Sequence, residues 1–208
     1  MISRKHKCIF VHIPKTGGSS IERIVWGAPQ ERKTDQLWMG FVRPHYNKYQ
    51  TGGLQHLLAK QIRQEVGAEL FGACYKFAFV RNPWDKAISQ YAYMKGRKDL
   101  RAFIGMEADA DLKTYLNLTM KKTHVQWDHQ HRFVLDDNGE QLVDFLGRFE
   151  TIGQDVDTVL ERLGMLGQKL PHTNKSKRGP YRDYYDDESR EMIADHYKTD
   201  IDTFGYSF

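Results

Sequence analysis

The stretch FVHIPKTGGSS at positions 10–20 decides the fold, because an apolar segment runs there into a glycine-bearing loop and a helix start. Residues 8–13 are mostly apolar and β-branched, as expected of a strand covered on both faces, and Pro14 ends the strand because it has no N–H to donate. The two adjacent glycines allow a sharp turn that brings backbone amides close to a ligand. The stretch therefore predicts an anion-binding turn at the positive end of a helix, with Lys15 beside it.

The lysine of this loop precedes the glycines, so the Walker A spacing is absent and an ordinary P-loop nucleotidase is disfavoured. A second interpretation is that a strand, a tight turn and a capped helix need these residues for structural reasons alone. The loop resembles the 5′-phosphosulfate loop of sulfotransferases that use 3′-phosphoadenosine 5′-phosphosulfate (PAPS). The resemblance implies that the donor is held by Pro14, Lys15, Thr16, Gly17, Gly18, Ser19 and Ser20.

Length and composition predict one soluble globular domain over residues 1–208. Of the 208 residues, 40% are hydrophobic and 28% are charged, and no stretch approaches a membrane span. Residues 1–7 are too short and polar for a signal peptide, which predicts a cytoplasmic protein. The two cysteines, Cys8 and Cys74, predict buried thiols rather than a disulfide framework, and no Cys/His spacing indicates a metal site.

A second buried strand is predicted over residues 75–80, YKFAFV, which contain no strand breaker. The strand leads into a helix entry, where Asn82 can cap, Pro83 fits the first helical position and Asp85 complements the positive end of the helix. In an open α/β sheet, ligands collect at the carboxyl ends of the strands. We therefore expect Arg81 to lie near the same sheet edge as the glycine loop.

The residues FAFVRNPWD at 77–85 resemble the second sulfotransferase signature, which binds the 3′-phosphate of the nucleotide. The resemblance implies that Arg81 and Ser89 hold this phosphate, and an arginine fork together with a hydroxyl suits that ligand. The alternative is that Arg81 pairs with a carboxylate while Ser89 lies on the helix surface. Two positions depart from the family pattern: Lys86 replaces an arginine, and a Gln-His pair ending at His56 replaces Lys-His.

The rest of the chain predicts further α/β elements: a helix over 54–70, a helical insert over 94–123, a strand over 133–135, a turn over 136–139, a strand within 142–150, a helix over 154–163 and a helix from about 187.

Two later segments resemble the carbohydrate-type branch of the family. They are GRFE at 147–150, which suggests Arg148 and Glu150 as cleft residues, and LPHTN at 170–174. An exposed ion pair at a strand end is the alternative for the first segment. For the second, the resemblance implies a loop that covers the nucleotide, and a flexible solvent loop is the alternative. The implied cover residues are Lys175, Lys177, Arg178 and Tyr181.

Sulfuryl transfer requires in-line positioning and stabilisation of the leaving phosphate, and we assign the second role to Lys15. No metal is expected, because only one bridging charge develops. A hydroxyl acceptor needs a base, and the nine histidines offer candidates. His56 is the first choice and His45 the second, whereas His12 is expected to pack within the strand end.

These observations predict an α/β fold with a central, mostly parallel sheet flanked by helices, resembling the P-loop-like sulfotransferase fold. The predicted activity is sulfuryl transfer from PAPS to an acceptor hydroxyl, with a saccharide suggested by the family branch alone. The alternatives are a nucleotide-dependent kinase of a small metabolite and a non-catalytic adenosine-bisphosphate-binding module. The net charge of +4 comes without a continuous basic and aromatic face, so no nucleic-acid partner is expected.

Overall fold

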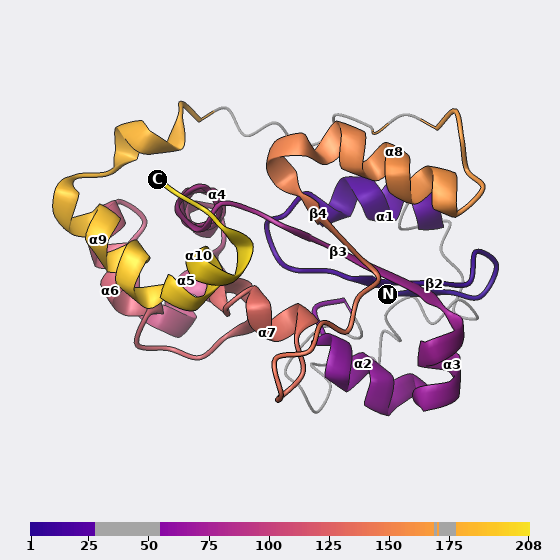
Figure 1. Ribbon diagram of the computed structural model, residues 1–208. Helices are drawn as coiled ribbons and strands as arrows, with labels where there is room; N and C mark the ends of the chain where they lie inside the picture. Colours follow the sequence, from indigo (N-terminus) through magenta and orange to yellow (C-terminus); the bar gives the residue numbers. More distant parts are fainter. Residues whose placement is uncertain (28–54, 169, 171–177) are drawn as a thin grey trace. The chain divides into compact units, whose positions relative to one another are not determined.

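A computed structural model describes residues 1–27, 55–168, 170 and 178–208 of the chain. Contacts between residues divide the chain into two compact units (Figure 1). The sheet lies in unit 1, and unit 2 is built from helices. Unit 1 comprises Met1–Val80 and Gln130–Asn174, and unit 2 comprises Arg81–His129 and Lys175–Phe208.

The sheet of unit 1 has four strands in the order β1-β2-β3-β4. Strand β1 runs antiparallel to β2, whereas β2, β3 and β4 run parallel to one another. The predicted central, mostly parallel sheet is thus confirmed, and β1 is an edge strand that was not predicted. The bounds are Ile2–Ser3 for β1, Cys8–Val11 for β2, Tyr75–Val80 for β3 and Phe145–Arg148 for β4.

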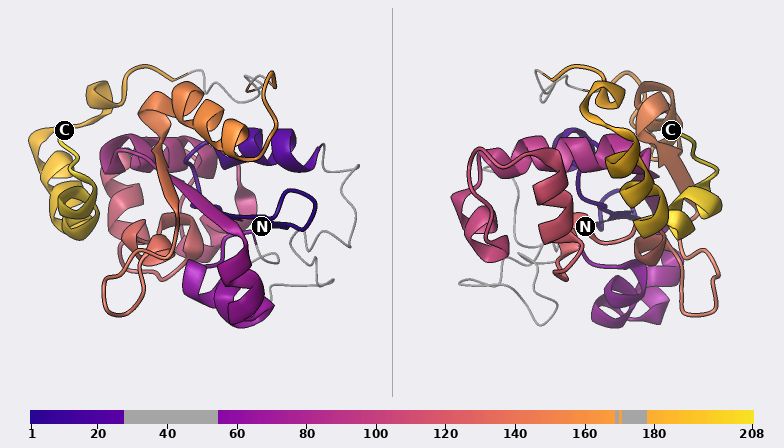
Figure 2. Two further views of the ribbon diagram at one scale, coloured as in Figure 1. Left: turned by 45° about the vertical axis from the view of Figure 1, so that its right-hand side comes forward. Right: turned by 90° about the vertical axis from the view of Figure 1, so that its left-hand side faces the viewer.

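Helices cover both faces of this sheet (Figure 2). On one face, Phe10 of β2 and Phe77 and Phe79 of β3 pack into a core with α1 and α8. Because side chains alternate across a strand, the residues between them point to the other face, where α2, α3 and α7 lie. The helix bounds are Gly18–Trp26 (α1), Ala59–Val66 (α2), Ala68–Ala73 (α3), His131–Val134 (α7) and Ile152–Arg162 (α8).

Two sequence predictions in unit 1 are wrong. The single helix expected over 54–70 is two helices, because Gly67 adopts a positive φ of 86° between them. The strand expected over 133–135 is the short helix α7, and only Leu135 forms an isolated antiparallel bridge, with Gln141. The turn predicted over residues 136–139 is present between Leu135 and Gln141.

Unit 2 is organised around α4, whose predicted start is confirmed. The Asn82 side chain accepts a hydrogen bond from the N–H of Trp84 at 3.0 Å, and Pro83 takes the first helical position. The C-terminal helix expected from about residue 187 is two helices, α9 and α10. The bounds in this unit are Pro83–Lys95 (α4), Lys98–Ile104 (α5), Leu112–Thr119 (α6), Val125–Trp127 (η3), Tyr181–Tyr184 (η5), Asp187–His196 (α9) and Lys198–Phe204 (α10).

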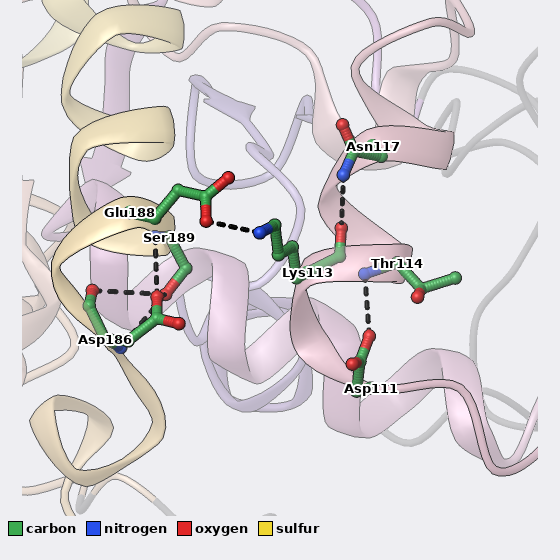
Figure 3. Close-up of polar contacts among 7 residues, drawn as sticks. All are labelled: Asp111, Lys113, Thr114, Asn117, Asp186, Glu188 and Ser189. Carbon is green, nitrogen blue, oxygen red and sulfur yellow. Dashed lines mark hydrogen bonds and ion pairs between the residues drawn. The ribbon is translucent and has the colours of Figure 1, made fainter.

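Helices α6 and α9 of this unit are both capped by aspartates, as Figure 3 shows. Asp111 and Asp186 each accept a hydrogen bond at 2.8 Å from the backbone N–H three residues on. Lys113 of α6 forms an exposed ion pair with Glu188 of α9, a contact type that contributes little to stability. No helix in the described ranges is long and apolar enough to cross a membrane.

Candidate functional site

The glycine loop of unit 1 connects β2 to α1 through a turn with unusual backbone conformations. Lys15 has a φ of 68°, in the left-handed region that residues other than glycine rarely adopt, and Gly17 has a φ of 86°. The buried Thr16 hydroxyl donates a hydrogen bond to the carbonyl oxygen of Ile13 at 2.9 Å and closes the turn. The loop therefore enters the nine-residue helix α1 at its N-terminus, where backbone N–H groups and the helix dipole favour an anion.

Glycine is favoured at both positions of this loop, at Gly18 by the ring of His12 and at Gly17 by its positive φ. A Cβ added to Gly18 would lie 2.1 Å from Nε2 of His12, and one added to Gly17 would lie 2.5 Å from Cδ1 of Ile152. The space beside each of these two backbone positions is thus occupied by side chains of the protein. The two serines do not cap α1, since Gly17 is the N-cap and no side-chain cap bond forms.

His12 packs within the strand end, as predicted, and has a partner that sequence analysis missed. Its Nδ1 lies 2.7 Å from Oε1 of Glu22 on α1, and the two residues are only 4% and 2% exposed. Gln55 Nε2 donates to the same carboxylate at 3.2 and 3.4 Å. A charged residue on the apolar side of α1, next to Ile21, was the signal in the sequence for this contact.

His56 lies against His12, with its Nδ1 2.9 Å from the carbonyl oxygen of His12 and the two ring centroids 4.5 Å apart. Because a carbonyl only accepts, Nδ1 of His56 carries the hydrogen and Nε2 is the acceptor nitrogen. Burial, and secondarily the neighbouring His12, lowers the pKa of His56 to about 3. The free imidazole is therefore neutral at physiological pH and has a weak affinity for a proton.

Arg81, in unit 2, is held by a carboxylate. Its Nε and Nη2 donate to Oδ2 of Asp85 at 2.8 and 2.7 Å, and Nη2 of Arg178 pairs with Oδ1 of the same residue. The carboxylate partner weighed as an alternative for Arg81 is thus present. Two guanidinium groups share this carboxylate, so the three side chains taken together carry a net positive charge. The buried Nε of Arg178 has no hydrogen-bond partner within the described residues, so the donor set suits an additional anion.

The contacts of the other predicted site residues do not indicate a role for them. Ser89 is partly buried on α4, and the ring of Tyr181 packs edge-on against Phe208 with a centroid distance of 5.7 Å. In unit 1, Arg148 and Glu150 are exposed. The remaining candidates, His45, Lys175 and Lys177, lie outside the described residues.

Lys86, which departs from the family pattern, belongs to the interior of unit 2. Its Nζ donates to the carbonyl oxygen of Asp128 at 3.2 Å and lies 5.6 Å from the ring centroid of Tyr197. Burial lowers its pKa to about 8. The side chain thus anchors helix α4 to the segment that follows η3.

Comparison with known proteins adds two findings. A family model described as "Sulfotransferase family" matches residues 1–207, which include both units. An uncharacterized protein of Archaeoglobus fulgidus is 28% identical over 129 residues, which cover 60% of the present chain and 96% of that protein.

Proposed function

The chain belongs to the sulfotransferase family, enzymes that take sulfate from PAPS, and we propose that its acceptor is a hydroxyl group of a saccharide. The family match supports sulfuryl transfer in general and implies PAPS as the donor. The proposal of a saccharide acceptor rests on the resemblance of residues 147–150 and 170–174 to the carbohydrate-type branch of the family. The observation that carries our assignment of the site is the lysine-glycine turn at the N-terminus of α1.

We assign the 5′-phosphosulfate of the donor to this turn. The left-handed conformation of Lys15 and the two close-packed glycines fix the path of the backbone before any ligand arrives. The positive end of α1 and the ammonium group of Lys15 would both favour the phosphosulfate anion. Pro14, Thr16, Ser19 and Ser20 complete this proposed donor site.

The 3′-phosphate is assigned to Arg81 and Arg178, with Ser89 as a neutral donor. Both guanidinium groups are largely buried, at 7% and 11% exposure of the side chain, so their hydrogen bonds are shielded from water. Asp85 already orients both groups, which lowers the cost of ordering them when the phosphate binds. Tyr181 and Lys177 remain proposed cover residues.

In the proposed reaction, the acceptor oxygen forms a bond to sulfur while the bond from sulfur to the phosphate oxygen breaks. Lys15 neutralises the charge that develops on that leaving oxygen. The proton of the acceptor hydroxyl passes to a base, and we favour Nε2 of His56 because the hydrogen bond at Nδ1 fixes this tautomer. Since the pKa of the free imidazole is lowered to about 3, this role requires the negative charge of the bound donor to raise the pKa of His56. His45 remains the second candidate, and the expectation that no metal takes part remains a prediction.

Family membership favours this activity over a metabolite kinase, and a non-catalytic nucleotide-binding module remains the second candidate. Calorimetric titration with 3′-phosphoadenosine 5′-phosphate (PAP), with adenosine 5′-phosphate as competitor, tests the donor site. We expect micromolar PAP binding that depends on the 3′-phosphate. An incubation with PAPS and a panel of saccharides then separates the two candidates: sulfated product supports the enzyme, and PAP binding without turnover on any acceptor or water supports the binding module. Failure to bind PAP would refute the donor site.

A further inference from the structure

Glu22 connects three elements of unit 1 at one buried point. It lies on α1, its Oε1 is 2.7 Å from Nδ1 of His12 at the end of β2, and it accepts from Gln55, which precedes α2. His56 follows Gln55 directly and donates to the carbonyl oxygen of His12. The carboxylate is thus linked to His56 by two routes, through His12 and through Gln55.

A carboxylate at this place needs an explanation beyond packing. The other buried side chains of α1, Ile21, Val25 and Trp26, are apolar, and burying a charged group costs free energy unless it is paired and hydrogen-bonded. Glu22 meets that condition through His12 and Gln55. An apolar residue would fill the same space without the desolvation cost, but it could not orient an imidazole or an amide.

The position of the His12 ring extends this linkage to the glycine loop. Nε2 of His12 lies where a Cβ of Gly18 would be, at 2.1 Å from that ideal position. Rotation of the ring would therefore disturb the first residue of α1. The hydrogen bond from Nδ1 to Glu22 holds the ring in the orientation that the glycine accommodates.

We propose that Glu22 is a positioning residue, which acts through His12 and Gln55 to hold His56 as the tautomer protonated at Nδ1. Its consequence for turnover rests on the proposed function. Its consequence for the tautomer of His56 does not, because that depends only on contacts within unit 1. The two consequences can be measured separately.

The tautomer is measured by NMR of protein labelled with ¹⁵N-histidine, with His56 assigned from the spectrum of His56→Gln. We expect the wild-type protein to show His56 protonated at Nδ1 alone. In Glu22→Leu, which keeps the apolar volume but removes both acceptor oxygens, we expect a mixture of the two tautomers. Glu22→Gln, which keeps one acceptor oxygen, should restore most of the wild-type signal.

Glu69→Leu is the matched control, because Glu69 is exposed on α3 and its replacement removes the same charge. If Glu22→Leu does not fold, Gln55→Leu breaks one of the two routes at a partly exposed position and should shift the tautomer signal in the same direction. A wild-type His56 protonated at Nε2 would overturn the proposal. An unchanged His56 signal in folded Glu22→Leu, or in Gln55→Leu where that variant replaces it, would overturn it equally.

Turnover and binding complete the test. We expect Glu22→Leu to bind PAP within about threefold of the wild-type affinity while kcat falls about 10- to 100-fold, the range found when a group that orients a metal-bound histidine is removed. Equal losses of PAP affinity and kcat would indicate a merely structural role and count against the proposal. If the wild-type protein fails to bind PAP, the proposed function fails, and the tautomer measurement still decides the role of Glu22.

Discussion

Replacement of Arg81 by alanine tests the proposed 3′-phosphate site. The expected loss of PAP affinity can be worked out from the surroundings of Arg81. Arg81 is 6% exposed, and its guanidinium group donates to Asp85 in the absence of ligand. A hydrogen bond that involves a charged group contributes about 1.5–3 kcal/mol net, and 1.4 kcal/mol corresponds to a tenfold change in affinity. Loss of one such bond to the 3′-phosphate should therefore weaken PAP binding about 10- to 100-fold.

The assay is calorimetric titration of the variant with PAP and with adenosine 5′-phosphate. Because adenosine 5′-phosphate lacks the 3′-phosphate, its affinity should change by less than about threefold, and the preference for PAP should largely disappear. Arg63→Ala is the matched control, since Arg63 is an exposed arginine on α2 and has no part in the proposed donor site. Equal losses for both nucleotides, or unchanged PAP affinity, would refute the assignment of Arg81.

The variant also changes the ion-pair network, so folding must be monitored alongside binding. Without Arg81, Asp85 still pairs with Arg178, and the carboxylate is not left as a buried charge without a partner. Arg81→Lys separates the two effects, because it keeps the positive charge but loses the planar fork. We expect Arg81→Lys to recover stability more fully than PAP affinity, as judged by thermal unfolding and calorimetry.

Further predictions concern unit 1. Lys15→Ala should lower turnover at least about 100-fold while PAP affinity changes by less than about tenfold, because the lysine acts on charge that develops in the transition state; loss of PAP binding to the same extent would contradict this role. Gly18→Ala should destabilise the protein by about 1–3 kcal/mol in denaturant unfolding, because the new Cβ would overlap the ring of His12. Gly153→Ala, on the open side of α8, should instead stabilise it by about 0.5–1 kcal/mol, and equal effects would refute the packing argument. His56 has a pKa of about 3 when folded and about 6.5 when unfolded, so the unfolded chain binds the extra proton as the pH falls. The free energy of unfolding should therefore decrease from about pH 6.5 toward pH 3, and this decrease should be shallower in His56→Gln.

The elements that were predicted best from the sequence are those in which all local signals indicate the same structure. The run over residues 75–80 is apolar, aromatic and free of breakers, and it forms β3 with the predicted bounds. The start of α4 was equally predictable, because Asn82 and Pro83 suit the cap and first helical positions and no other role. In such segments the local sequence is sufficient to predict the secondary structure.

Elsewhere the local signal was ambiguous. Residues 133–135 are apolar, but so short a run fits a buried helix turn as well as a strand, and the chain forms α7 there. The apolar spacing over residues 54–70 correctly indicated helix, yet it does not report that Gly67 turns the chain between α2 and α3. Backbone direction at a single glycine is set by tertiary packing, which periodicity does not encode.

The largest omission from the sequence interpretation was the pairing of two acidic residues, Glu22 in unit 1 and Asp85 in unit 2. Lys15 and Arg81 were predicted as site residues because each stands in a stretch that resembles an anion-binding signature. The partners of Glu22 and Asp85 are instead set by the folded structure. Glu22 contacts His12, which lies ten residues away, and Asp85 was interpreted only as a charge at a helix start. In the folded protein Glu22 pairs with His12 and Gln55, and Asp85 pairs with Arg81 and Arg178. In the proposed 3′-phosphate site, Asp85 orients both arginines, so that part of the cost of ordering them is met before the phosphate binds.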